Sequence, residues 1–213
     1  MSVLGEESEC HGLRERKKAR TRRELRAAAL ERARVQGPDG FTVEEICADV
    51  DVSPRTFFNH FPTKDAVLFG WSDSGLAELA ETVRARAGDS ALAVATSVLG
   101  DVAAALTTSP IWHGQLQLIR THPELNARMA EAGRTVETTV AQALAERGGR
   151  DGPGVDDRIA AATAMGLLHV TVLTWLDDPS GPDARVLYDD VVARARDAFA
   201  SPAVVPGGLS PSR

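Results

Sequence analysis

The sequence predicts an all-α protein in which a small N-terminal helical domain precedes a larger helical domain. Three observations support this fold class. Alanine is abundant whereas aromatic residues make up only 5% of the chain, which favours helices over sheets. Apolar residues recur at steps of three and four, as in the stripe from Leu125 to Leu144. Glycine and proline clusters break this pattern at intervals that suit single helices.

The N-terminal domain is expected at residues 13–65, after a polar tail at residues 1–12 that is expected to be disordered. Its first helix is expected at residues 13–36. Gly37 ends this helix, because glycine accepts the left-handed backbone that follows many helices. The sequence GPDG then supplies the turn.

Two short helices follow, and each begins at a residue that suits a helix N-cap. Thr42 is expected to cap the first, with Glu45 completing a capping box. Ser53 is expected to cap the second, and Pro54 occupies its first position, where a missing N–H costs nothing. The two helices are expected at residues 42–50 and 53–61, with a tight turn between them.

The C-terminal domain is expected at residues 66–200 and has a helical pattern throughout. Residues 201–213, with three prolines and two glycines, are expected to form a disordered tail. Helices are expected near residues 64–87, 90–108, 110–121, 124–147, 155–178 and 183–200.

One segment of this domain, residues 159–176, carries no charge and reaches the length of a membrane span. It is built on alanines, however, and also holds threonine, glycine and histidine. Acidic residues flank both ends, without the basic anchors of a membrane helix. We therefore expect a helix that protein buries on most sides, and no membrane association.

Charge is distributed unevenly along a chain whose net charge is −6. Residues 11–64 hold 12 basic against 8 acidic residues, whereas residues 71–213 hold 12 basic against 18 acidic residues. A basic end on an acidic body indicates that one end meets a polyanion.

Enzyme and metal motifs are not found in the sequence. The chain has no G-x-S-x-G, P-loop or dinucleotide fingerprint, and its histidines lack metal-ligand spacing. Cys10 and Cys47 provide neither a disulfide framework nor a zinc spacing, and Cys47 is expected to be an inert core thiol. We therefore expect no enzyme activity, no metal, no cofactor and, since no secretory signal is seen, a cytoplasmic location.

The two short helices and their turn have the proportions of a helix-turn-helix. In the second helix, Phe57 and Phe61 lie four residues apart and are expected to anchor its inner face. Arg55, Thr56 and Asn59 then face outward. In the major groove, Arg pairs with guanine, Asn with adenine, and a Thr methyl group with thymine. The alternative is that any short amphipathic helix has one polar side.

Nearby basic residues support an interaction with nucleic acid. Lys64 follows a helix start, so its ammonium and the first N–H groups of that helix suit a phosphate. The stretch RERKKARTRR, which ends in Arg22 and Arg23, is expected to contact phosphates or the minor groove. The alternative for this stretch is a solvated charged face.

The stretch TVEEICADVDVSPRTFFNHFPTKDAVL closely resembles the DNA-binding domain of the TetR family of bacterial repressors, over about residues 18–68. The resemblance implies base contacts from Arg55, Thr56 and Asn59. It implies that Ser53 belongs to the same surface and that Thr42, Phe58, His60 and Lys64 lie on the DNA backbone. The residues that match the family pattern are Thr42, Ile46, Val52, Ser53, Thr56, Phe57, Phe58, His60, Phe61 and Lys64.

The sequence departs from the family pattern at four positions. Asp51 stands where the turn usually has glycine, and Phe58 stands where a tyrosine hydroxyl is usual. Ala33 and Pro38 replace aromatic residues, and Phe41 is expected to fill part of that space.

Three tryptophans, Trp71, Trp112 and Trp175, fall in three different predicted helices of the C-terminal domain. They are candidates to line a ligand cavity between helices, which is where helical bundles place such sites. The alternative is that they belong to an ordinary core. The further candidates for this cavity are Leu116, Ile119, Met165, His169 and Val172.

The stretch LIRTHPELNARM, residues 118–129, resembles more loosely a group of actinobacterial TetR-family regulators whose C-terminal domain is associated with acyl-CoA-like ligands. That resemblance implies an elongated apolar slot for an acyl chain. Arg120 and Arg128 would then be the cations for a phosphate-bearing head group.

Together these features predict a homodimeric repressor that binds an inverted-repeat operator in double-stranded DNA and is released by a small hydrophobic effector. The dimer interface is expected on the helices at residues 155–178 and 183–200. Two alternatives remain: a DNA-binding regulator gated by a protein partner, and an enzyme that uses the Trp and His cavity.

Overall fold

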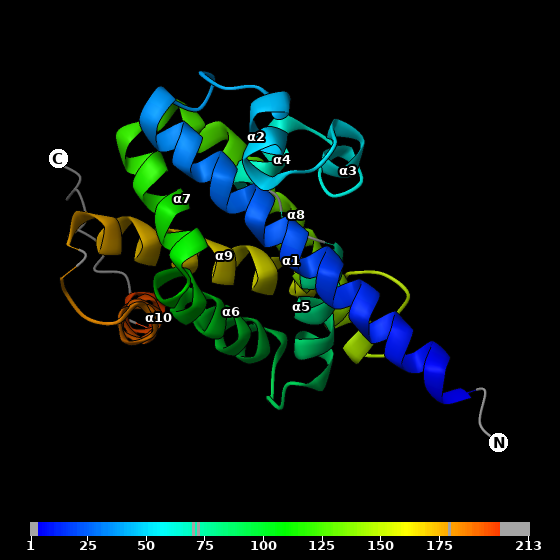
Figure 1. Cartoon of the computed structure of the whole chain (residues 1–213). Coiled ribbons are helices and arrows are strands. Elements are labelled where there is room, and N and C mark those ends of the chain that lie inside the picture. The colour runs from blue at the N-terminus through cyan, green and yellow to red at the C-terminus, as the bar shows by residue number, and fades with distance from the viewer. Residues whose placement is uncertain (1–3, 70, 72, 179, 201–213) are drawn as a thin grey trace, which may run out of the picture.

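The computed structural model describes residues 4–69, 71, 73–178 and 180–200. Over this part of the chain the regular secondary structure is helical throughout (Figure 1), so the predicted all-α class is confirmed. The helices are α1 (Leu4–Gln36), α2 (Val43–Val50), α3 (Pro54–Phe58), α4 (Lys64–Phe69), α5 (Asp73–Ala85), α6 (Ala91–Thr108), α7 (Pro110–Thr121), a 3-10 turn (Pro123–Leu125), α8 (Asn126–Arg147), α9 (Val155–Asp177) and α10 (Ala184–Ala200).

Two apolar cores hold these helices together. Helices α5, α6, α8, α9 and α10 form what we call the body, whose core includes Leu99, Leu144 and Tyr188. The N-terminal core is built mainly by α1 to α4. Leu118 and Ile119 of α7 belong to the N-terminal core, whereas Leu116 of the same helix belongs to the body. Helix α7 therefore connects the two parts of the molecule.

The caps of the two short helices form as the sequence predicts. The Thr42 N–H donates to Glu45 Oε2 at 2.7 Å, and the Glu45 N–H donates to Thr42 Oγ1 at 3.2 Å. Ser53 Oγ accepts the N–H of Thr56 at 3.2 Å. Between the helices, Asp51 adopts a left-handed backbone with φ 54° and ψ 50°, a conformation that Asp tolerates better than most residues.

The helix expected at residues 64–87 is instead divided into α4 and α5. Side chains from other helices bind main-chain carbonyls at this break. Arg26 Nε donates to the Val67 carbonyl at 3.0 Å, and Arg22 Nη2 donates to the Trp71 carbonyl at 3.2 Å. The side-chain amide of Gln115 donates to the Leu68 carbonyl. Tertiary hydrogen bonds thus replace part of the helical ladder, so local sequence periodicity did not reveal the break.

Two smaller expectations also need correction. The first helix begins at Leu4, so the described part of the tail that was expected to be disordered, residues 4–12, extends α1. Helix α3 ends at Phe58 and the chain continues as a turn. The tail expected at residues 201–213 lies outside the described residues.

Helix α9 crosses the body (Figure 1) and packs against α6, α8 and α10. By length and composition it could cross a membrane, but 39% of its most apolar window is buried inside the protein. In the single chain one face of α9 packs on the body and the other lies open, so the body alone does not bury it on most sides. That open face includes Val155, Ile159, Val170 and Leu173.

Candidate nucleic-acid interface and ligand site

Helix α3 has an apolar face that packs inward and a polar face that points to solvent. Phe57 and Phe61 are fully buried, with ring centroids 5.6 Å apart. They pack in the N-terminal core with Leu25 of α1 and Ile46 of α2. The two aromatic residues therefore fix α3 on the domain, as the sequence predicts.

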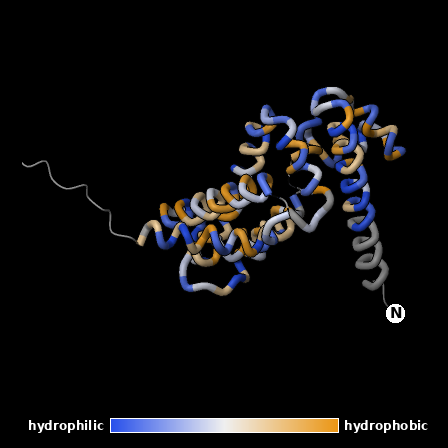
Figure 2. The backbone as a smooth tube through the Cα atoms, turned by 90° about the vertical axis from the view of Figure 1, so that its left-hand side faces the viewer, coloured by the Kyte–Doolittle hydropathy of each residue, from blue (hydrophilic) through white to orange (hydrophobic). Residues whose placement is uncertain are grey.

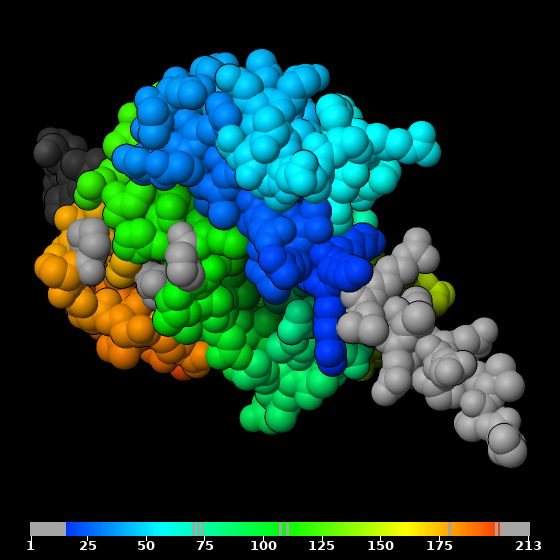
Figure 3. Space-filling view, viewed as in Figure 1, coloured from blue at the N-terminus to red at the C-terminus, as the bar shows by residue number. Residues whose placement is uncertain are grey.

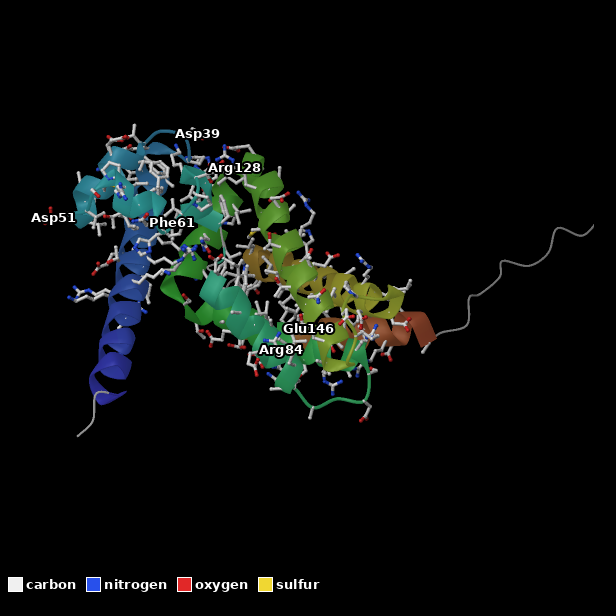
Figure 4. All side chains as sticks on the ribbon, turned by 90° about the vertical axis from the view of Figure 1, so that its right-hand side faces the viewer. Asp39, Asp51, Phe61, Arg84, Arg128 and Glu146 are labelled. Atoms are coloured by element: carbon white, nitrogen blue, oxygen red, sulfur yellow. The ribbon has the colours of Figure 1, made fainter. Side chains whose placement is uncertain are left out.

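On the opposite side of this segment, Arg55 and Asn59 are exposed. They lie one turn apart, since the Asn59 N–H donates to the Arg55 carbonyl at 3.1 Å. Phe58 is also 54% exposed, which is unusual for a large apolar side chain. Figure 4 shows Asp51, in the preceding turn, at the outer edge of the domain. Arg55, Asn59 and Phe58 are therefore all accessible to a binding partner at this edge of the domain.

The three expected hydroxyl contributors are already engaged within the domain. Thr56 Oγ1 lies 3.0 Å from Ser53 Oγ, and Thr42 Oγ1 lies 3.2 Å from a carboxylate oxygen of Glu45. The hydrogen bond from the Thr42 N–H holds the pKa of Glu45 below its usual value. Ser53 and Thr42 are nonetheless exposed, so both can meet a second partner at the surface.

Arg22 differs from the other basic residues that were expected to contact DNA. Its guanidinium donates to the carbonyls of His60 and Trp71 and lies 4.2 Å from the centre of the Phe61 ring. Burial lowers its pKa. The structure thus gives Arg22 an internal role that the sequence analysis missed, because nothing in a basic run distinguishes the residue that turns inward. Its neighbour Arg23 is exposed.

A cluster of exposed basic residues of α1 lies N-terminal to Arg22. Residues 16–20, with two arginines and two lysines, are all exposed. This hydrophilic part of α1 runs away from the body (Figure 2). It leaves the molecule on the side where α3 also lies (Figure 1), so both are available to one extended polyanion.

His60 and Lys64 are half-buried at the edge of this surface. His60 Nδ1 is buried and has no hydrogen-bond partner. Burial lowers the pKa of His60, and the positive charges of Arg22 and Lys18 lower it further. Lys64 Nζ donates to the Phe41 carbonyl at 2.9 Å and lies 4.5 Å from the centre of the Phe41 ring. An ammonium carries three donors, so this bond leaves Lys64 able to meet a phosphate.

Cys47 lies in the N-terminal core with 2% of its surface exposed. Burial raises the pKa of its thiol, and the nearby carboxylate of Glu44 raises it further. A thiol with a raised pKa is a poor nucleophile at neutral pH. These properties match the inert core thiol that the sequence analysis expected.

In the body, the structure brings together six of the residues expected at a ligand cavity. The rings of Trp71 and Trp112 have centroids 5.3 Å apart. Leu116, Val172 and Trp175 line an interior void of only about 10 Å³, which holds no more than a water molecule. Met165 packs against the same core. Leu116 and Trp175 belong to the body core and the other four pack against it, partly buried, and the void that three of them line is far smaller than a slot for an acyl chain.

The remaining expected residues lie elsewhere. Ile119 packs in the N-terminal core, and Arg120 and His169 are exposed. Arg128 is also unavailable as a free cation for a head group, because its guanidinium pairs with two carboxylates of the N-terminal domain. These positions were not predictable from the sequence, because each depends on how α7, α8 and α9 are rotated about their axes when they pack.

Comparison with known proteins assigns both parts of the chain. Residues 25–70 match the family described as bacterial regulatory proteins, tetR family. Residues 89–200, more than half of the chain, match the MftR C-terminal domain of the same family. The protein belongs to the TetR family. This is a family of transcriptional regulators and not of enzymes, so the expectation of no enzyme activity is confirmed.

A curated relative of this TetR-family chain is the HTH-type transcriptional regulator TcmR of Streptomyces glaucescens. The two are 52% identical over 56 residues, which are 26% of this chain. The match spans only 25% of the length of TcmR. The likeness therefore concerns one segment and not the whole regulator.

Two solved structures share the fold. FadR from Bacillus subtilis, in complex with stearoyl-CoA, is 18% identical with a TM-score of 0.52, covering 80% of this chain and 95% of that one. NalD of Pseudomonas aeruginosa, the secondary repressor of the MexAB-OprM multidrug efflux pump, is 18% identical with a TM-score of 0.54, covering 84% and 96%. At this identity the similarity establishes a common fold.

This TetR-family chain also has a surface groove that sequence analysis did not predict. We call it the α1–α7 groove; its volume is about 630 Å³. Figure 3 shows α1 and α7 side by side on one face of the molecule. The groove is lined by Ala27, Leu30, Glu31 and Arg34 of α1 and by Ile111, His113, Gly114, Gln117, Leu118, Thr121 and His122 at α7.

Proposed function

We propose that this TetR-family protein binds an inverted-repeat operator in double-stranded DNA as a homodimer, represses transcription there, and is released by a small hydrophobic ligand. The observation that carries the DNA-binding part is the pair Arg55 and Asn59, exposed one turn apart over the buried anchor Phe57. An Arg and an Asn at such positions suit guanine and adenine in the major groove. The exposed basic residues at positions 16–20 supply phosphate contacts in this proposal.

The homodimer is supported by the open face of α9. Val155, Ile159, Val170 and Leu173 are each between 47% and 73% exposed, and an apolar strip of this kind marks an interaction site. A two-fold dimer would place two α3 helices one turn of DNA apart, about 34–36 Å or a multiple of that. The operator would then be an inverted repeat.

The test of DNA binding begins with selection from a random duplex library by the purified full-length protein. We expect an inverted repeat to emerge, bound by two copies of the chain in mobility-shift and native mass spectrometry experiments. Selection of a single half-site, bound by one copy, would contradict the dimeric mode.

Within this proposal, an acyl-CoA-like molecule is the ligand class to test first, as the sequence resemblance implies. FadR from Bacillus subtilis, which shares the fold, was solved with stearoyl-CoA. Competition of acyl-CoAs of graded chain length against operator DNA is the direct assay. Unchanged DNA affinity and unchanged melting temperature across the series would remove this ligand class.

A second proposal is a DNA-binding regulator gated by a protein partner. The void beside Trp175 favours it, because at about 10 Å³ it is far smaller than a small-molecule site and the tryptophans expected to hold a ligand leave no room for one there. Native mass spectrometry of the purified protein distinguishes the two proposals. A co-purified small molecule would favour a ligand, whereas a stable complex with another protein chain would favour the partner.

A further inference from the structure

Three hollows of the described part of the molecule differ in size and chemistry. The void beside Trp175 is too small for an organic ligand. The hollow between α6 and α10, about 280 Å³, is lined by charged residues that include Arg185, Asp189 and Arg196. The α1–α7 groove, at about 630 Å³, lies within the range of small-molecule sites.

The walls of the α1–α7 groove suit hydrocarbon. Leu30, Ile111 and Leu118 are among its apolar lining residues. Its two ionised residues, Glu31 and Arg34, neutralise each other through hydrogen bonds of 2.6 and 2.9 Å. A charged group gains little from a wall that carries no net charge, whereas an apolar surface gains by leaving water. The groove is open along one side, which leaves room for a polar head in solvent.

We propose that the α1–α7 groove binds the hydrocarbon part of an amphipathic small molecule whose polar head stays in solvent. This inference rests on the proposed function, because it assigns a place to the hydrophobic effector. The site lies against the helix that leads into the helix-turn-helix, and not in the interior of the body. The sequence instead predicts an effector site among the tryptophans.

Contacts around the groove connect its occupation to DNA binding. A Cβ atom added at Gly114 would lie 3.6 Å from Leu30 Cδ1, so α1 and α7 approach closely there. Leu118 lines the groove and also packs in the N-terminal core with Leu25 and Ala29 of α1. A molecule in the groove beside Leu30 and Gly114 therefore acts on the approach that positions α1 relative to the body. It releases DNA only if it binds the DNA-incompetent arrangement more tightly.

The proposal is tested by photolabelling the full-length protein with a palmitic acid that carries a mid-chain diazirine, followed by peptide mapping. We expect labels on residues 27–34 of α1 and on residues 111–122, in and just after α7. Labels confined to α6, α9 and α10 would overturn the proposal. An absence of any label at saturating fatty acid would overturn it too, because a fatty acid has the stated chemistry.

Two variants fill the groove, and one matched variant leaves it open. Gly114→Leu projects a side chain toward Leu30, and Ala27→Leu adds bulk from an exposed position on α1. Each is expected to reduce labelling roughly tenfold, which corresponds to about 1.4 kcal/mol of binding free energy. Ala77→Leu, at an exposed position on α5, is expected to leave labelling unchanged. Equal labelling of all three variants would overturn the proposal. If Gly114→Leu does not fold, the comparison of Ala27→Leu with Ala77→Leu still tests it.

Release of operator DNA by the same fatty acid is measured in parallel, so that the two proposals fail separately. Groove labelling without DNA release supports the site and counts against its role as an effector site. If the fatty acid releases DNA but labels only the body, the ligand-gated function is supported and the α1–α7 groove is overturned as the ligand site.

Discussion

The guanidinium of Arg128 on α8 lies 3.0 Å from a carboxylate oxygen of Asp65 on α4, so an ion pair joins the body directly to the DNA-binding domain. The same guanidinium lies 3.3 Å from Asp39 in the turn after α1. Figure 4 shows Arg128 next to Asp39. A cation that was expected to meet a ligand head group is instead part of the joint between the two domains.

We predict that Arg128 and Asp65 contribute to stability as a pair. Because both side chains are partly exposed, Arg128→Gln and Asp65→Asn should each lower the free energy of unfolding by about 1 kcal/mol or less. The loss in free energy of unfolding should be smaller in the double variant than the sum of the losses in the two single variants. Urea titrations of the four proteins measure this, and strictly additive losses would mean that the pair does not interact in solution.

We predict that Arg55 and Asn59 read bases. Arg55→Ala or Asn59→Ala should cost about 1–3 kcal/mol on the selected operator and relax the preference at one position of each half-site. Lys64→Ala should weaken binding to all DNA sequences by the same factor and reduce the salt dependence of binding. Equilibrium binding to a panel of single-base operator variants is the measurement. A change in base preference from Lys64→Ala, with none from Asn59→Ala, would reverse these roles.

We predict that Arg22 and Arg23 differ, although they are neighbours. Arg22→Gln should lower the free energy of unfolding by about 1–3 kcal/mol, because the main-chain carbonyls of His60, after α3, and Trp71, before α5, lose their donor. Arg23→Gln, the matched change at an exposed position, should alter stability by less than about 0.5 kcal/mol. Thermal and urea denaturation compare the two. Equal losses would show that Arg22 is not held inward in solution.

We predict that a charge on the open face of α9 or on α10 prevents dimer formation. Ile159→Glu and Val191→Glu should give monomers by light scattering at micromolar concentration and should lose operator binding. Ala77→Glu, on the exposed face of α5, is the control and should remain dimeric. A wild-type protein that is already monomeric at this concentration would refute the dimer.

We predict that His60 makes stability depend on pH. Its pKa is lowered from the usual 6.5 by burial, Arg22 and Lys18, so the unfolded chain takes up the proton first as the pH falls. Stability is therefore full above the usual histidine pKa and falls as the pH drops from about 6.5 through the lowered value of the folded state. Melting temperatures of wild type and His60→Gln between about pH 5 and pH 8 measure this. An identical pH dependence of both proteins would assign the effect to other groups.

Much of the N-terminal domain was predictable because its signals are local. The Thr42 and Glu45 capping box, the Ser53 cap and the buried pair Phe57 and Phe61 each depend on residues three or four apart. Short-range geometry of this kind is the same in any helix-turn-helix. The identity of the outward-facing side chains follows from it.

The α1–α7 groove was less predictable because it depends on the approach of distant segments. Leu30 and Gly114 line it together from more than eighty positions apart in the sequence, and no local pattern indicates that approach. The break between α4 and α5 has the same origin, since Gln115 and Arg22 bind carbonyls from outside the helix. Trp112 and Trp175 pack in or against the body core as expected, but the close approach of Trp71 to Trp112 could not be inferred from spacing alone.

Helix α1 is one uninterrupted helix of 33 residues, about 50 Å long. Such a rod amplifies a small rotation. If α1 turned by about 10° at the Leu30 contact with Gly114, its far end at Leu4 would move by roughly 7 Å, because about 39 Å of helix lies between them. A fluorophore attached near that end would therefore be displaced by several times the movement at the α1–α7 groove. A change too small to resolve at the α1–α7 contact would become a measurable distance at the opposite end of the helix.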